Sequence, residues 1–510
     1  MDAYDPSARR PLPDQFVDRP EPEDYGDRWD AEQALIDAET AGYSKGLKRR
    51  HIQMIAVGGA IGTGLFLGAG GRLNTAGPAL VFVYAVCGVA VFFVLRALGE
   101  MVLFRPTSGS FVSYAREFMG EKGAFVAGWM YFLLWACAGI ADITAVAVYA
   151  KYWGVFSAIP QWLIALIALI AVLAVNLVSA KLFGEIEFWA AIIKVVAITA
   201  FMMIGLYFLV TKTQVDGVTP GLAMVSDNGG WIPHGLLAAV IVVPGVVFAY
   251  SSLELVSIAA GETKEPAKIV PKATNAVIWR VGIFYCGSVL LLALLMPWTA
   301  YSADESPFVT FLAAAGVGGA GSIMNFVVLT AALSSVNSGL YATGRILRSM
   351  SVSGSAPSFV GRMNRRKVPA GGILFVAIAY LVGILLNFVV PQDAFEIVLN
   401  FAALGILSTW TFILVGHLIY LRKSQSDHDF VRPSFRMPLA PYTNYVTLAF
   451  LFAVLVLMWF DVPVGRITVI GLIPIGIALL IGWRVVRGKV ADTADGFADL
   501  ARERNELEEP

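Results

Sequence analysis

Three ionisable side chains lie inside long apolar stretches of the sequence, namely Asp142, Lys194 and Glu254. A charge at the centre of a bilayer costs on the order of 3 kcal/mol on insertion scales, so ionisable residues at such depth are candidates for function. Lys194 is a candidate for proton exchange, because removal from water favours the neutral amine. The alternative is a fixed ammonium that binds backbone carbonyls. Glu254 is a candidate for a proton or gating role, although it and Asp142 could instead bond a helix end or a nearby hydroxyl.

Two interruptions of apolar stretches offer a second kind of chemistry, hydrogen bonding by free backbone groups. The first is the glycine-rich run 58–64, and the second is the segment 243–254, in which Pro244 and Gly245 weaken a helix. In hydrocarbon such breaks persist only where protein, water or a ligand satisfies the freed N–H and C=O groups. Two breaks at corresponding places in two halves of a membrane protein predict a binding site near the midplane. The glycines of the first break also fit close helix packing.

A broken helix suits a small solute that carries both a carboxylate and an ammonium. The second half of the broken helix presents free N–H groups at the positive end of its dipole, and the first half of the helix ends in free carbonyls. Phe248 and Tyr250 flank the second break and could close over the solute, and a carboxylate at Asp142 could accept from a carboxamide. The other candidate contacts are amide donors to the carboxylate at Thr63, Gly64 and Leu65, carbonyl acceptors near Ala60, Phe248, Ala249 and Ser251, and Ile61 within the first break.

The composition is that of a polytopic membrane protein. Of 510 residues 57% are hydrophobic and only 15% are charged, with a mean hydropathy of +0.71, which is far too apolar for an ordinary soluble domain. The 37 basic residues balance the 37 acidic ones, so no nucleic-acid partner is indicated. Three cysteines and four scattered histidines give no disulfide framework and no metal-ligand spacing. We expect no cofactor.

The fold predicted from windows of about 20 apolar residues is all-helical. Basic residues gather in alternate loops, so the positive-inside rule predicts that both termini are cytoplasmic. The stretch 1–45, which is acidic and rich in proline, is predicted to be a disordered cytoplasmic tail, and 488–510 a second tail, on either side of a transporter domain at 46–487. The twelve predicted spans are 53–73, 77–103, 124–150, 161–181, 187–210, 234–260, 276–299, 320–347, 370–390, 395–421, 442–460 and 467–486.

The two breaks fall in predicted spans one and six, five spans apart. An odd offset places the second set of five spans upside down relative to the first, as in an inverted-repeat secondary transporter. The first repeat is then 53–210, the inverted second repeat 234–421, and the accessory spans 442–486. An ion channel would need a continuous polar lining or a filter sequence, and a membrane enzyme would need clustered acid, base or metal ligands. Neither pattern is visible. The sequence also contains no phosphate-binding loop, so a nucleotide-driven pump is not indicated.

Several motifs resemble those of amino-acid permeases of the amino acid–polyamine–organocation (APC) superfamily. They include 59–66 (GAIGTGLF), 96–100 (RALGE), 106–111 (PTSGSF), 184–189 (GEIEFW) and 332–341 (ALSSVNSGLY). The resemblance runs from about residue 46 to 487. Within the superfamily the sequence is most similar to bacterial L-asparagine permeases, through 140–147 (IADITAVA), 227–230 (DNGG) and 354–359 (GSAPSF).

The resemblance implies a LeuT-like fold of five plus five spans with two accessory helices, in the plasma membrane of a bacterium. It implies import of an amino acid, most simply L-asparagine by proton symport, with another neutral amino acid or exchange as the alternatives. It places a gate at Phe248 and sets Lys194 where related sodium-driven carriers hold an ion. Asn337, Ser338 and Trp410 are expected behind or around the cavity. Three further acidic residues are expected near cytoplasmic helix ends, paired with loop cations: Glu100, Glu185 and Glu187.

Overall fold

The computed structural model describes residues 31–43, 47–260, 265–302, 305–389, 393–426 and 430–508, and within these ranges the regular secondary structure is helical apart from an isolated bridge between Val215 and Val218. The helices up to residue 226 are α1 (Ala31–Thr40), α2 (Arg49–Ala60), α3 (Thr63–Phe66), α4 (Gly68–Ala76), α5 (Leu80–Phe104), α6 (Phe111–Met119), α7 (Glu121–Ala150), α8 (Gln161–Val178), α9 (Ala180–Thr211) and α10 (Ala223–Ser226). Those that follow are α11 (Gly235–Ile241), α12 (Val243–Ala249), α13 (Leu255–Ala260), α14 (Pro266–Arg280), α15 (Ser288–Leu295), α16 (Pro307–Ala314), α17 (Ala320–Val352), α18 (Ala370–Val389), α19 (Asp393–Ser426), α20 (Tyr442–Phe460) and α21 (Val464–Glu508). A π-helical segment, Val281–Gly287, joins α14 to α15, and 3₁₀ turns lie at Gly77–Ala79, Gly154–Phe156, Trp298–Ala300 and Ser358–Gly361.

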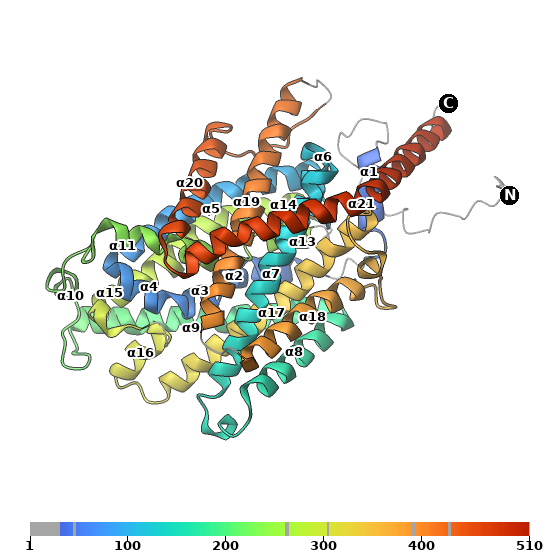
Figure 1. The fold of residues 1–510 in the computed structure, drawn as a ribbon. Helices are drawn as coiled ribbons and strands as arrows, with labels where there is room; N and C mark the ends of the chain where they lie inside the picture. The colour runs from blue at the N-terminus through green and yellow to red at the C-terminus, as the bar shows by residue number, and fades with distance from the viewer. Residues whose placement is uncertain are drawn as a thin grey trace.

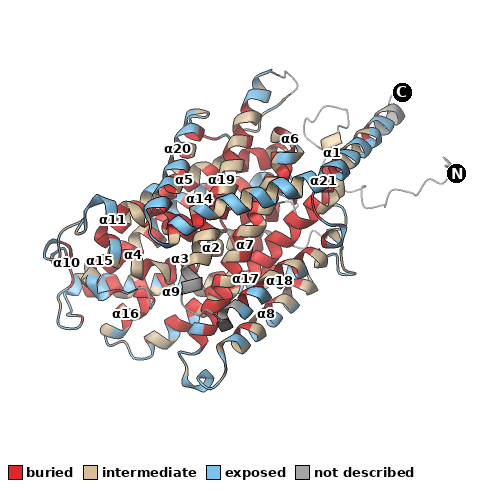
Figure 2. Cartoon of the chain, in the orientation of Figure 1, coloured by how far each residue is buried: buried red, intermediate tan, exposed pale blue. Residues whose placement is uncertain are grey.

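The helices form one bundle in which segments distant in sequence lie side by side (Figure 1). At its centre α7 packs along both α17 and α19, and α2 packs along α9. Buried residues concentrate in these inner helices, whereas α20 and α21 expose one face (Figure 2). That face carries large apolar side chains such as Phe452, Phe460 and Ile473. Exposed apolar surface of this kind suits lipid and not water.

Each predicted span overlaps one helix or a series of helices. Among the described residues, nine helical stretches are long and apolar enough to cross a membrane, and Gly235–Ala249 and Ala370–Leu385 are shorter apolar helices. The protein is therefore a multi-pass membrane protein. The count of twelve crossings and the inverted repeat stay predictions, because broken and short helices do not by themselves define crossings.

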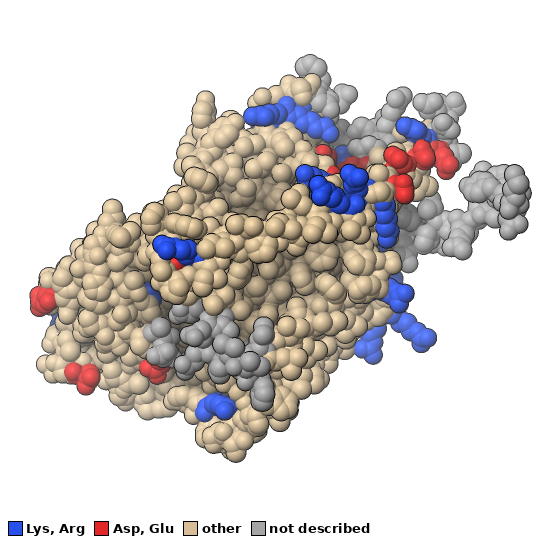
Figure 3. Space-filling model, viewed as in Figure 1, with Lys and Arg blue, Asp and Glu red and all other residues tan. Residues whose placement is uncertain are grey.

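Lys and Arg side chains gather toward the end of the bundle where α1 and the C-terminal end of α21 lie (Figures 1 and 3). This distribution agrees with the bias that the sequence shows between alternate loops. The cytoplasmic placement of this end remains a prediction.

The structure differs from the predicted disordered tail at residues 31–40, which form α1 beside α21. The anchor is Glu39, which is 1% exposed and accepts hydrogen bonds at 2.6 Å from Arg116, Ser113 and Ser349. A glutamate in a free tail would be solvated, whereas here it neutralises a buried arginine. Burial also raises the pKa of Glu32, in the first turn of α1, to about 8. Residues 1–30 and 44–45 of the predicted tail lie outside the described residues.

The first predicted break is confirmed. Helix α2 ends at Ala60, Ile61 and Gly62 are non-helical, and α3 begins at Thr63. Gly62 is extended, with φ −117° and ψ −172°, so the direction of the chain changes before the helix resumes. The predicted span of 53–73 is thus three helices, α2, α3 and α4.

The second predicted break is confirmed as well. Helix α12 ends at Ala249, the segment 250–254 is a turn, and α13 begins at Leu255. Ser252 has a φ of +78°, a conformation that L-residues other than glycine rarely adopt. Helix α3 packs against α12, so the two breaks lie next to each other.

Candidate functional site

A cavity lies between the two breaks and the helices that face them. Both breaks contribute mainly small residues, α9 contributes Lys194, and α17 contributes a row of hydroxyl groups. Its lining is polar at several points although it lies inside a largely apolar bundle, which is typical of a site for a small polar solute. The residues that line it are Gly58, Gly59, Gly62, Thr63, Gly64, Lys194, Phe248, Ala249, Ser251, Ser252, Ala331, Ser334, Ser335 and Ser338.

Glycine lets the two breaks approach at backbone distance. A Cβ on Gly64 would lie 2.5 Å from Cα of Ala249, and one on Gly59 would lie 3.1 Å from the carbonyl oxygen of Ser252. Side chains at these positions would push the two broken helices apart. The glycine run therefore serves the close packing of the two breaks as well as their backbone geometry.

The backbone of the first break has free donors at the start of α3. Hydrogen bonding resumes with the amide of Leu65, which donates to the carbonyl of Gly62 at 3.2 Å. The amides of Thr63 and Gly64 precede that bond, at a helix start whose first N–H groups lack partners within the helix. Leu65 is thus a weaker candidate donor than the sequence suggested, and its fully buried side chain does not line the cavity.

The carbonyls of the second break are partly engaged by the protein. The amide of Ser251 donates to the carbonyl of Phe248 at 2.9 Å, and the hydroxyl of Tyr285 donates to the carbonyl of Ala249 at 2.9 Å. Tyr250 points away from the lining and donates to the carbonyl of Tyr84 at 2.7 Å. Phe248 is the aromatic residue of this break that lines the cavity.

Lys194 lies beside the first break, as the sequence indicated. It is 2% exposed, and its Nζ donates to the carbonyl of Gly58 at 2.7 Å and to Oγ of Ser334 at 3.1 Å. The predicted alternative of an ammonium bound to carbonyls of the first broken helix is thus realised in this conformation. It does not exclude proton exchange, because the same ammonium borders the cavity.

Asp142 is placed behind the cavity and does not line it. The hydroxyl of Thr63 donates to Oδ1 at 2.7 Å, and the hydroxyl of Ser335 donates to Oδ2. Both of these residues do line the cavity. Asp142 therefore holds the first break against α17 in this conformation, and its predicted contact with a substrate side chain stays a prediction.

Glu254 is completely buried in the turn between α12 and α13. The hydroxyl of Tyr131 donates to its Oε1 at 3.4 Å, and its Oε2 has no hydrogen-bond partner among the residues that the structure describes. A buried oxygen without a partner costs free energy and points to a role outside simple packing.

Glu187 was expected near a cytoplasmic helix end with a loop cation, and this expectation is wrong. It is 2% exposed, with Oε2 accepting from Ser334 at 2.7 Å and Oε1 accepting from Nδ2 of Asn337 at 2.7 Å. Asn176 of α8 in turn donates to Oδ1 of Asn337 at 2.7 Å. The predicted span began at 187, whereas α9 begins at Ala180, so Glu187 lies two turns inside the helix.

The other two acidic residues of that group do pair with cations. Glu100 is fully buried and accepts from Arg432 at 2.6 Å, and Glu185 pairs with Arg50. Three predicted site residues are buried but are not among the residues that line the cavity: Ile61, Asn337 and Trp410. Ser338 lines it, and Ala60 is placed by its backbone at the end of α2.

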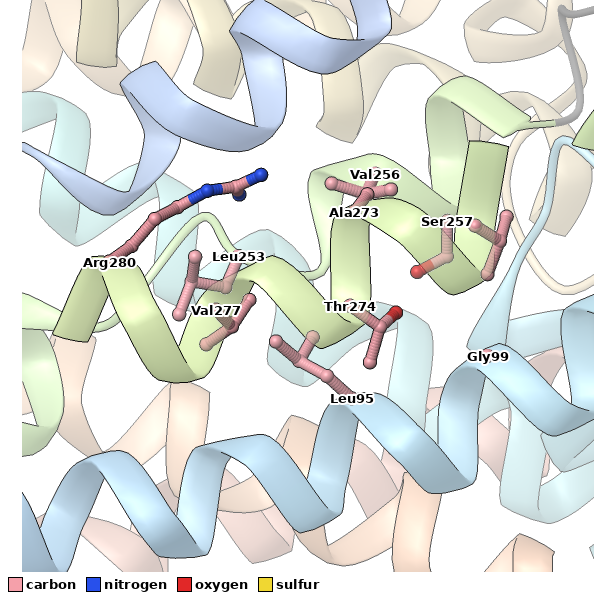
Figure 4. Close-up of a pocket in the computed structure, with 10 residues that line it drawn as sticks. Leu95, Gly99, Leu253, Val256, Ser257, Ala273, Thr274, Val277 and Arg280 are labelled. Atoms are coloured by element: carbon pink, nitrogen blue, oxygen red, sulfur yellow. The ribbon is translucent and has the colours of Figure 1, made fainter. Parts of the chain in front are cut away.

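A second pocket lies between α5, α13 and α14 (Figure 4). Leu253 and Val256 line it beside Val277 and Leu95, and Arg280 stands at one side. The inner half of the second broken helix is therefore incompletely packed on this side.

The sequence held a signal for the residues that were missed. Ser334 and Ser335 share one face of a helix with Ser338, which was singled out, in an otherwise apolar stretch, and this spacing predicts a polar stripe. Glu187 and Lys194 are seven residues apart, so they share a face of α9. Tyr285 gave no comparable signal, because its partner is a backbone carbonyl of a distant helix.

None of the described His, Cys, Asp and Glu residues form a group of three that could hold a metal ion. The polar groups at the cavity are backbone amides, carbonyls, hydroxyls and one ammonium. This set can bind a small zwitterion but offers no paired acid and base for covalent chemistry.

Comparisons with known proteins agree with this arrangement. The family described as amino acid permease matches residues 51–492. The chain is 60% identical to an L-asparagine permease of Streptomyces coelicolor, over 92% of this chain and 95% of that protein. It is 56% identical to the L-asparagine permease of Escherichia coli, over 92% and 94%, and 57% identical to L-asparagine permease 1 of Mycobacterium tuberculosis, over 89% and 93%. The chain belongs to the amino acid permease family.

Proposed function

We propose that this protein imports L-asparagine by proton symport across the plasma membrane of a bacterium, with both termini in the cytoplasm. The observation that carries the proposal is the cavity between the two helix breaks, which free backbone groups and hydroxyls line beside the buried Lys194. Relatives with 56–60% identity are named as L-asparagine permeases, which supports the choice of substrate.

The amides of Thr63 and Gly64 are the donors for the substrate carboxylate, at the positive end of α3 and the nearly continuous α4. The ammonium faces the carbonyls where α2 and α12 end. The hydroxyl oxygen of Ser335, whose proton goes to Asp142, can accept from the N–H of the side-chain carboxamide, and Ser338 lines the same side of the cavity. Asp142 acts on the site through Thr63 and Ser335, whose hydroxyls it fixes. Phe248 covers the substrate from the second break.

Proton movement is coupled to the conformational change through the hydrogen bond from Lys194 to the Gly58 carbonyl of α2. A protonated lysine makes a charge-assisted hydrogen bond, which is roughly twice as strong as a neutral one. Loss of the proton weakens the bond to the Gly58 carbonyl and frees the inner half of the first broken helix. The space beside α13 lets the inner half of the second broken helix follow.

The test is uptake of labelled L-asparagine into proteoliposomes, driven separately by a proton gradient and by a sodium gradient. We expect saturable, proton-driven uptake that unlabelled L-asparagine competes best. Strongest competition by an aromatic or cationic amino acid would reject the substrate, sodium-driven uptake alone would reject the proton, and uptake that requires internal amino acid would indicate an exchanger.

Substitution of Lys194 by alanine tests its role in coupling. We expect Lys194→Ala to lose proton-driven accumulation, with Lys181→Ala, at an exposed position near the start of the same helix, as the matched control. Loss of a proton-transfer group lowers rates by about 100-fold or more. Unchanged accumulation with an unchanged pH profile in Lys194→Ala would contradict the role.

A further inference from the structure

A hydroxyl group joins Lys194 to a buried carboxylate. Ser334 Oγ accepts from Nζ of Lys194 at 3.1 Å and donates to Oε2 of Glu187 at 2.7 Å. The three polar groups come from two helices, α9 and α17, that pack against each other. A hydroxyl that accepts from an ammonium and donates to a carboxylate is already oriented to pass a proton between them.

The environment of Glu187 is otherwise neutral. Its second oxygen accepts from the amide of Asn337, which Asn176 bonds in turn. The charged group that faces this pair from a neighbouring helix is Asp142 on α7, on the side of Lys194. Inside a bilayer, an ammonium and a carboxylate are costly to bury. Because one hydroxyl joins them here, transfer of a single proton would neutralise both groups.

We propose that Glu187 receives the coupling proton from Lys194 through Ser334. In the transfer an N–H bond of Lys194 breaks and its proton joins Oγ of Ser334, while the hydroxyl proton of Ser334 passes to Oε2 of Glu187. The products are a neutral amine and a carboxylic acid, so atoms and charge balance without another reactant. The inference rests on the proposed proton symport and names the residue that follows Lys194 on the proton path.

The position of Glu187 gives the path a direction. Glu187 precedes Lys194 by seven residues in α9, which is about 10 Å along a helix. On the predicted orientation α9 begins at the cytoplasmic end, so the carboxyl lies between Lys194 and the cytoplasm. The proton thus moves toward the cytoplasm while the hydrogen bond between Lys194 and the Gly58 carbonyl breaks. Release of the proton is in this way coupled to movement of α2.

The experiment compares Glu187→Gln and Ser334→Ala with Glu185→Gln, a neighbouring carboxylate that pairs with Arg50 and His51 instead. Three quantities are measured in proteoliposomes: accumulation driven by a proton gradient, protons taken up per L-asparagine, and counterflow of labelled L-asparagine at equal pH. Counterflow needs binding and the conformational change but no net release of a proton.

We expect Glu187→Gln to retain counterflow, and we expect both Glu187→Gln and Ser334→Ala to lower the rate of proton-driven accumulation by about 100-fold or more, as loss of a proton-transfer step predicts. Glu185→Gln should keep both. Wild-type accumulation and stoichiometry in Glu187→Gln would overturn the relay, and so would parallel loss of counterflow and accumulation in both variants, since that pattern marks a structural role. If the wild-type protein moves L-asparagine without protons, the proposed symport itself fails, which is a separate result.

Discussion

The two helix breaks reach the same cavity by different physical means. In the first break, glycines have no side chain, so the backbone of this break can approach the second break closely, as where Gly64 lies next to Ala249. The second break is built by hydrogen bonds from aromatic side chains, with Tyr285 holding the carbonyl of Ala249 and Tyr131 holding Glu254. The first should therefore tolerate no added volume, whereas the second should tolerate volume but depend on individual hydroxyls.

The largest effect is expected from Gly64→Ala. The new Cβ would lie 2.5 Å from Cα and 2.9 Å from Cβ of Ala249, a contact with backbone that cannot rotate away. Overpacking of this kind costs about 1–3 kcal/mol, and here it also displaces one break from the other. We expect near-complete loss of L-asparagine uptake.

The matched control is Gly416→Ala in α19, where a Cβ meets no described atom within 4 Å. That variant should transport normally, and both should be compared at equal amounts of protein in the membrane. Wild-type uptake in Gly64→Ala would show that the breaks do not need their backbone contact, and the distinction between the two breaks would fall.

An intermediate effect is expected from Tyr285→Phe. The substitution keeps the ring but removes the hydroxyl that holds the carbonyl of Ala249, and a typical hydrogen bond contributes about 1 kcal/mol. Tyr285 lies in a π-helical segment, a geometry often found at functional sites. We expect KM for L-asparagine to rise about fivefold, measured from initial uptake rates.

Tyr301→Phe is the control for that substitution, because the hydroxyl of Tyr301 is also buried but donates to the carbonyl of Leu292, which belongs to neither break. It should lower thermal stability without a matching change in KM. Equal KM values for wild type and Tyr285→Phe would mean that the second break keeps its shape without this hydroxyl.

How far the sequence predicts such detail depends on whether a residue acts alone or through a distant partner. The breaks and Lys194 were predictable because glycine, proline and an intramembrane charge are unusual in an apolar helix whatever surrounds them. Asp142 was singled out as a buried charge, but its bonds to Thr63 and Ser335 depend on how α7, α3 and α17 pack.

The position of a polar residue along its helix was predicted wrongly where that residue lies near the end of an apolar stretch. Glu187 looked like a cytoplasmic residue because hydropathy falls there, yet the helix continues to Ala180 and polar partners on α17 compensate for its burial. The helix α1 was missed for a related reason. The stretch 1–45 was interpreted by its acidity and its prolines, although 31–40 (AEQALIDAET) contains good helix formers and no proline. The partners of Glu39 then hold this helix against the bundle.

The smallest effect is expected from Ser252→Gly, which tests whether the second break stores backbone strain. Ser252 has a φ of +78°, where a residue with a Cβ is less stable than glycine by roughly 1 kcal/mol. Glycine relieves that strain in the folded state but gains freedom in the unfolded chain, so the net stabilisation is at most a fraction of this value. We expect a rise in the unfolding temperature of about 1 °C, against a fall for Ser251→Gly, whose φ is not positive. A lower unfolding temperature for Ser252→Gly would show that its side chain contributes more than its conformation costs, and the second break would then depend on side chains at every position tested.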